Sequence, residues 1–150
     1  MNVLCIIPCG SKKIWDINPH AGPTVARHVY VGSFTNKCQQ YAELFYPDSW
    51  CILSAKHGFL FPDDKVPKPY DVTFNDKKTN PISSAELSLQ AKNKGLNQYD
   101  SIIVIGGKIY TDRVSEIFDH NKISTPLQGC KGMGYMMGRL NEAIRRQRQI

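Results

Sequence analysis

The first loop with chemical potential follows an apolar run at residues 2–8. It consists of Cys9, Gly10, Ser11, Lys12 and Lys13. Backbone N–H groups around Gly10 can form a concave nest for phosphate, with Lys12 or Lys13 as a point charge. Alternatively, a desolvated lysine acts as a nucleophile, or the loop is a surface segment with solvated lysines. We expect this loop to belong to the functional site.

A second loop of similar character, Lys56-His57-Gly58, follows an apolar run at residues 50–55. His57 can titrate near neutral pH, so it is a candidate acid or base, and Lys56 is a candidate for binding an anion. Phe59 and Phe61 either offer flat faces to a nucleobase or fill the core, and we favour the core.

The proline-braced segment Pro67–Thr73 presents a phenol, a carboxylate and a hydroxyl group within four residues. These are Tyr70, Asp71 and Thr73. Asp71 is our preferred catalytic carboxylate, and a turn or capping aspartate is the alternative. Upstream, Tyr30 and Ser33 flank a glycine before the first long helix, and both are candidate contacts.

Glycines follow the third apolar run, at residues 101–105, and recur before the last helix. Gly106 and Gly107 lead into a helix whose N-terminus favours a negative group. The spacing is neither that of a P-loop nor of a dinucleotide fingerprint. Gly129 lies in a glycine-rich loop that can close over a ligand, whereas Met133 and Met136 are expected to be packing residues.

Strands and helices that position these loops alternate along the chain. The apolar runs 2–8, 50–55 and 101–105 are typical of buried strands. Helices are predicted at 33–45, 83–97, 110–119 and 132–147, and Ser83 with Glu86 forms a capping box. This order predicts one α/β domain, residues 1–150, with a mainly parallel sheet in a three-layer, Rossmann-like sandwich. The loops at the carboxyl ends of its strands should form the site.

Composition limits the partners and the compartment. The 150 residues carry a net charge of +6, and the pI is about 9.1, which favours anionic partners such as nucleic acid or nucleotides. Arg145, Arg146 and Arg148 contribute to this charge, either as an anion-binding tail or as a solvated helix end. No apolar run is long enough for a membrane helix. The first apolar run has no basic leader before it and no small-residue cleavage pattern after it, so we expect a cytoplasmic protein that does not bind membranes. The sequence leaves the oligomeric state open.

Cysteine usage argues against bound metal. The five cysteines form an odd number and include no C-x-x-C pair, which argues against a disulfide framework and a zinc knuckle. We expect reduced thiols, no metal site and no cofactor.

Four motifs together resemble a bacterial and phage family of small proteins of unassigned function that is related to the peroxide-stress protein YaaA. The motifs are residues 8–13, 30–34, 54–60 and 69–73. The first loop is also similar to the P-C-S-x-x-K-P-Y motif of archaeosine synthase, which modifies a deazaguanine base in transfer RNA. Here Lys13 is followed by Ile14 and Trp15, so the resemblance does not decide between Lys12 and Lys13.

This resemblance implies chemistry at a nucleobase or its N-glycosidic bond. We therefore expect a glycosidase or base-transfer enzyme in which Asp71 stabilises the sugar cation or activates water. Lys12 or Lys13 would bind phosphate or attack, and His57 would protonate the leaving base. Two alternatives remain: a non-catalytic module that binds nucleic acid or a nucleotide, and a nucleotide hydrolase or sensor centred on Gly106 and Gly107.

Overall fold

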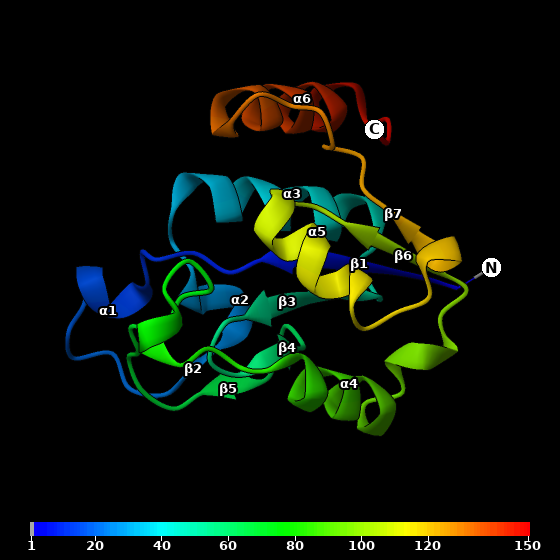
Figure 1. Ribbon diagram of the computed structural model, residues 1–150. Coiled ribbons are helices and arrows are strands. Elements are labelled where there is room, and N and C mark those ends of the chain that lie inside the picture. Colours follow the sequence, from blue (N-terminus) through cyan, green and yellow to red (C-terminus); the bar gives the residue numbers. More distant parts are fainter. Residues whose placement is uncertain (1) are drawn as a thin grey trace.

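A five-stranded sheet organises the computed structural model, which describes residues 2–150 (Figure 1). The strand order is β4-β3-β1-β6-β7. The strands are β1 (Val3–Pro8), β3 (Trp50–Ser54), β4 (Gly58–Leu60), β6 (Ser101–Val104) and β7 (Ile123–Ser124). Strand β1 runs parallel to β3 and to β6, as the apolar runs predict, with Ile6 opposite Cys51 on one side and Val104 on the other, and β7 runs parallel to β6.

Side chains of the central strands alternate between two cores because successive residues point to opposite faces of a sheet. Cys5 and Ile7 of β1 face the core beneath helices α3 (Ser33–Phe45) and α6 (Met133–Arg146). Leu4 and Ile6 face the core on the other side, against α4 (Ser84–Asn93) and α5 (Lys108–Ser115). The helices therefore cover both faces of the sheet, and α3 and α6 pack against each other (Figure 1). The prediction of an α/β protein is confirmed.

One edge of the sheet departs from a parallel arrangement. Strand β4 runs antiparallel to β3, with Ser54 opposite Gly58, so the sheet is mixed. The chain reverses within Ala55–His57 because Gly58 adopts a φ of +76°, a conformation that glycine tolerates best. The loop after β3 therefore turns directly into another strand rather than into a crossover helix.

Short elements outside the main sheet complete the fold. Strands β2 (Thr24–Val25) and β5 (Lys65–Val66) form a separate antiparallel pair. Helices α1 (Ile14–Ile17) and α2 (Ala26–Val29) follow the first loop. The 3₁₀ turns are η1 (Lys77–Thr79), η2 (Leu96–Gln98) and η3 (His120–Lys122).

The observed helices agree with the predicted ones in number of long segments but differ at some of their ends. The predicted cap at Ser83 is confirmed, since its hydroxyl accepts a hydrogen bond from the backbone N–H of Glu86 at 3.1 Å. The helix ends at Asn93 rather than residue 97, and α5 begins at Lys108 rather than residue 110. Within residues 2–150, no helix has the length and apolar character that crossing a membrane requires.

Candidate functional site

A cavity of about 570 Å³ lies where the chain leaves the carboxyl ends of β1 and β6. Its walls come from the first loop, the segment after Tyr70, the start of α5 and the start of α6. The lining residues are Pro8, Cys9, Gly10, Ser11, Lys13, Phe34, Asp71, Val72, Thr73, Asn75, Gly107, Lys108, Ile109, Tyr110, Met133 and Met136. The first loop, the segment after Tyr70 and the loop before α5, each identified by its chemistry, therefore meet at one cavity.

Lys13 is the most unusual residue of this cavity because its side chain is buried, with 7% of the residue exposed. Its ammonium group donates a hydrogen bond to the carbonyl oxygen of Ser11 at 3.2 Å and lies 4.4 Å from the centre of the Tyr70 ring. Burial lowers the pKa of Lys13, while the nearby Cys9, Asp16 and Asp71 oppose this shift. A buried amine with a lowered pKa is suited to proton donation or to nucleophilic attack.

Local backbone contacts decide which of the two lysines enters the cavity. The backbone N–H of Lys13 donates to the Asp16 carboxylate at 2.8 Å, at the start of α1, and Lys13 pairs with Tyr30 through an antiparallel bridge. Lys12 is exposed, does not line the cavity, and accepts a backbone hydrogen bond from Val31 at 3.1 Å. Of the two candidates, only Lys13 can act within this cavity.

Asp71 also lines the cavity and is exposed. The segment that carries it is fixed by Phe74, which is buried and packs edge-on against Tyr110 at 5.8 Å between ring centres. The hydroxyl group of Thr79 accepts a hydrogen bond from the N–H of Thr73 at 3.1 Å and donates to its carbonyl. Asp71 is therefore an accessible carboxylate on an anchored loop.

A cluster of hydroxyl groups supports the Tyr70 ring beneath Lys13. The Tyr70 hydroxyl contacts those of Tyr30 and Ser54, the latter at 2.9 Å. Ser54 also accepts hydrogen bonds from the backbone N–H groups of Lys56 and His57, at 3.3 and 3.0 Å. Burial raises the pKa of Tyr70 to about 12 and raises that of Tyr30 further, so both phenols are neutral at physiological pH.

His57 and Lys56 lie beside this cluster and do not line the cavity. The His57 ring packs edge-on against Tyr70 at 5.2 Å, and the Lys56 ammonium group is 5.9 Å from the centre of the Tyr70 ring. Burial and the charge of Lys56 lower the pKa of His57. Its Nε2 atom is buried with no hydrogen-bond partner among the described residues. The role of His57 as an acid stays a prediction.

Cys9 joins the first loop to α5. Its thiol lies 3.3 Å from the Tyr110 hydroxyl, which donates to the Cys9 carbonyl at 3.1 Å. Burial raises the pKa of Cys9, so the thiol is protonated at neutral pH. Gly10 packs closely on α3, since a Cβ atom there would come within 2.7 Å of the Thr35 hydroxyl.

A second hollow of about 770 Å³ adjoins the cavity through Gly107, Lys108 and Met136. Gly106 and Gly129 line this hollow and not the cavity, whereas Gly107 lines both. Ser33 is exposed at the start of α3 and lines neither.

Several wall residues were not predicted from the sequence. Met133, expected to be a packing residue, is 59% exposed and lines the cavity, whereas Met136 packs against the core as expected and also lines the cavity. Phe34, Asn75 and Tyr110 were not selected, although Phe34 stands next to the predicted residue Ser33. Phe59 is fully buried, as expected for a core residue, and Phe61 packs against the same core.

The lining combines flat apolar surface with hydroxyl, amide, carboxylate and ammonium groups. Such a mixture suits a small organic ligand of mixed polarity, because apolar walls give affinity and a few polar groups fix orientation. Within residues 2–150, no three histidine, cysteine, aspartate or glutamate side chains cluster as a metal site would require.

Comparisons with known proteins identify relatives by sequence. The chain is 44% identical, over the full length of both proteins, to the "Uncharacterized protein YfjM" of Bacillus subtilis (strain 168). No solved structure matches significantly. The model of the family of unknown function DUF6884 matches residues 4–142. The chain therefore belongs to the DUF6884 family.

Proposed function

We propose that this protein is an enzyme that acts on the nucleobase or the N-glycosidic bond of a nucleic acid or nucleotide. The observation that carries the proposal is the buried ammonium group of Lys13, which shares a cavity with the carboxylate of Asp71. A general acid and a general base at one cavity are what hydrolysis of a glycosidic bond needs.

The cavity has the size and surface for a nucleobase with its sugar. Its volume of about 570 Å³ is within the range of small-molecule sites. Phe34, Ile109 and Met136 offer apolar surface for a flat ring, and Thr73 and Asn75 offer polar groups for its edge. The net charge of +6 attracts phosphate-bearing substrates. The resemblance of the loop motifs to the YaaA-related family supports the same class of chemistry.

The proposed step is hydrolysis with two proton transfers. The oxygen of a water molecule forms a bond to C1′ of the sugar while the C1′–N bond breaks and its electron pair passes to the base. The Asp71 carboxylate accepts a proton from the water, and the Lys13 ammonium group donates a proton to the departing nitrogen. Solvent then returns a proton from Asp71 to Lys13. The lowered pKa of Lys13 makes it a better proton donor than an exposed lysine.

We also propose that the α/β fold is a Rossmann-like, three-layer sandwich and that the protein works in the cytoplasm. Cores on both faces of the sheet support the first point. The second is supported by the cysteines, all five of which are free thiols.

The test measures base release from labelled single-stranded DNA, RNA and free nucleotides. We expect Lys13→Met and Asp71→Asn to lower the rate at least about 100-fold, which is the usual contribution of a general acid or base. The matched controls are Lys12→Met, an exposed neighbouring lysine, and Asp48→Asn, an exposed aspartate that lines no part of the cavity. Both should keep the wild-type rate.

Lys13→Met should also keep or raise the free energy of unfolding, because it replaces a buried ammonium group with an apolar chain of similar length. Loss of activity in a stable Lys13→Met protein therefore reports on chemistry rather than folding. No release from any substrate, or equal loss for Lys12→Met and Lys13→Met, would overturn the proposal. Binding that survives Asp71→Asn without any base release would instead indicate the non-catalytic module.

A further inference from the structure

The positive charge of the chain is concentrated at its C-terminal end. Residues 131–148 carry Lys131, Arg139, Arg145, Arg146 and Arg148 against a single carboxylate, Glu142. This segment therefore holds a net charge of +4 out of the +6 of the whole chain. Lysines and arginines elsewhere are nearly balanced by carboxylates, so the field that attracts anions arises mainly at α6.

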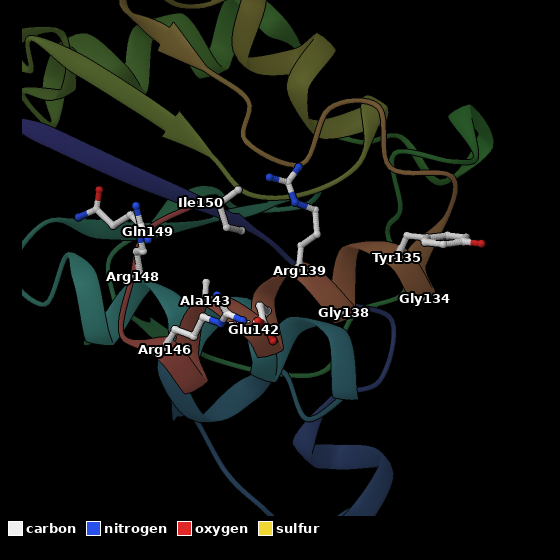
Figure 2. Close-up of a pocket in the computed structure, with 10 residues that line it drawn as sticks. All are labelled: Gly134, Tyr135, Gly138, Arg139, Glu142, Ala143, Arg146, Arg148, Gln149 and Ile150. Atoms are coloured by element: carbon white, nitrogen blue, oxygen red, sulfur yellow. Dashed lines mark ion pairs between the residues drawn. The ribbon is translucent and has the colours of Figure 1, made fainter.

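Three of these cations border a groove of about 600 Å³ between α6 and the C-terminal residues 148–150 (Figure 2). Arg139, Arg146 and Arg148 line it. Gly134 and Gly138 also line it, and because they have no side chains they do not fill the groove. Arg145 and Arg146 both form ion pairs with Glu142, at 2.7 and 2.5 Å, and this carboxylate neutralises only one of the two. The groove thus retains a positive excess.

Tyr135 adds an aromatic face at one end of the groove. Its side chain is 69% exposed and extends away from the helix (Figure 2). Exposed aromatic rings beside arginines are the usual means by which proteins bind single-stranded nucleic acid, since bases stack on the ring while cations contact phosphates.

The C-terminal residues are held in place rather than frayed. The N–H of Arg148 donates to the Ala143 carbonyl at 2.9 Å, which closes the end of α6. The Gln149 side chain accepts from the Tyr46 hydroxyl at 3.2 Å, and the N–H of Ile150 donates to the Tyr41 hydroxyl at 3.2 Å. Arg148 is therefore presented at a fixed position beside the groove.

A series of adjoining hollows leads from this groove to the catalytic cavity. Tyr135 and Arg139 line both the groove and a hollow next to it, which Gln128, Gly129 and Cys130 also line. Gln128, Gly129 and Cys130 also line the second hollow described above, and this hollow adjoins the cavity through Met136. A chain of nucleotides with one base in the cavity would thus find cationic surface for its neighbouring phosphates.

We infer that the groove between α6 and residues 148–150 binds the sugar-phosphate backbone of single-stranded nucleic acid, so that the substrate of the cavity is a polynucleotide rather than a free nucleotide. This inference rests on the proposed function for the identity of the cavity. Single strands are favoured because their bases need not be extruded from a duplex before entering the site.

The test measures binding of a fluorescein-labelled 20-nucleotide single strand, in separate DNA and RNA arms, by fluorescence anisotropy. All proteins carry Asp71→Asn, so that the strand stays intact. Arg139→Gln with Arg148→Gln should weaken binding about 25-fold at 0.1 M salt and reduce the slope of log K against log salt by about 1.4, because each phosphate contact contributes about 0.7 to that slope. The matched control, Lys65→Gln with Lys92→Gln, removes two exposed charges outside this groove and should have a much smaller effect.

The aromatic contact is tested by a second pair of variants. Tyr135→Leu should weaken binding about tenfold, whereas Tyr135→Phe, which keeps the ring, should bind as the parent does. Equal losses for the arginine and lysine pairs, or no measurable binding of either strand, would overturn the inference.

A separate base-release assay distinguishes the two proposals. Strand binding that depends on Arg139 and Arg148 without base release by the wild-type protein would support strand binding by the groove and refute the proposed function. Base release from free nucleotides with no strand binding would support the proposed function and refute the inference about the groove.

Discussion

Replacing Gly58 with alanine should destabilise the protein by about 3 kcal/mol. Gly58 has a φ of +76°, where an alanine costs about 1 kcal/mol after allowing for the lower entropy of its unfolded chain. In addition, its Cβ would lie 2.1 Å from Oε1 of Gln90. The Gln90 amide must then move and lose its hydrogen bonds to the Phe59 N–H and the His57 carbonyl, both 2.9 Å, which together contribute about 2 kcal/mol.

Urea unfolding separates the two contributions. Gly95→Ala is the matched control, since Gly95 has a φ of +73° and an added Cβ would approach only the side-chain amide of the exposed Gln98, at 3.0 Å. It should cost about 1 kcal/mol. In a Gln90→Ala background the cost of Gly58→Ala should also fall to about 1 kcal/mol, because the clash is gone. Equal costs at Gly58 and Gly95, or an unchanged cost in that background, would refute this account of the turn that carries His57.

Two further predictions concern the groups around Tyr70. Tyr70→Phe should lower the free energy of unfolding by about 1–3 kcal/mol in urea, because it removes the hydroxyl that contacts the buried hydroxyl groups of Tyr30 and Ser54. Tyr135→Phe at the exposed position should change it by less than about 0.5 kcal/mol. His57→Gln should reduce the loss of stability on acidification. The pKa of His57 in the folded protein lies below its ordinary value of 6.5, so the unfolded chain binds a proton there at a higher pH than the folded protein does. The free energy of unfolding of the wild type therefore falls as the pH drops from 6.5 through the lowered pKa. Thermal unfolding between pH 7 and pH 4.5 measures this effect, with the exposed His28→Gln as control, and a decline as steep in His57→Gln as in the wild type would contradict it.

The strands and the long helices could be predicted because their residues carry local signals. Apolar, β-branched runs marked β1, β3 and β6, and the apolar spacing marked α3 to within its observed bounds. The location of the cavity also followed, since loops at the carboxyl ends of parallel strands must lie at one edge of the sheet. The antiparallel β4 did not follow, because a single glycine conformation at Gly58 decides whether the chain reverses there.

The sequence alone could not decide which of Lys12 and Lys13 enters the cavity, and the structure decides it. Both residues have the same type and stand next to each other, so no pattern in the sequence separates them. The pairing of Lys13 with Tyr30 and the capping contact with Asp16 turn its side chain inward. Met133 is exposed at the cavity rather than packed, because the loop before α6 brings this end of the helix to the cavity, whereas Met136 packs against the core as expected.

The burial of Lys13 is the strongest argument that this cavity has a function. Removing an ammonium group from water is costly, and the contacts with the Ser11 carbonyl and the Tyr70 ring replace only part of its hydration. A methionine would fill the same space without this cost. Side chains that lower the stability of the fold are characteristic of active sites, because the reaction requires charged or polar groups that folding alone would not place in a buried position. Because Tyr30, Ser54 and Tyr70 form a hydrogen-bonded support beneath it, the ammonium group would already be in position when the proposed substrate binds.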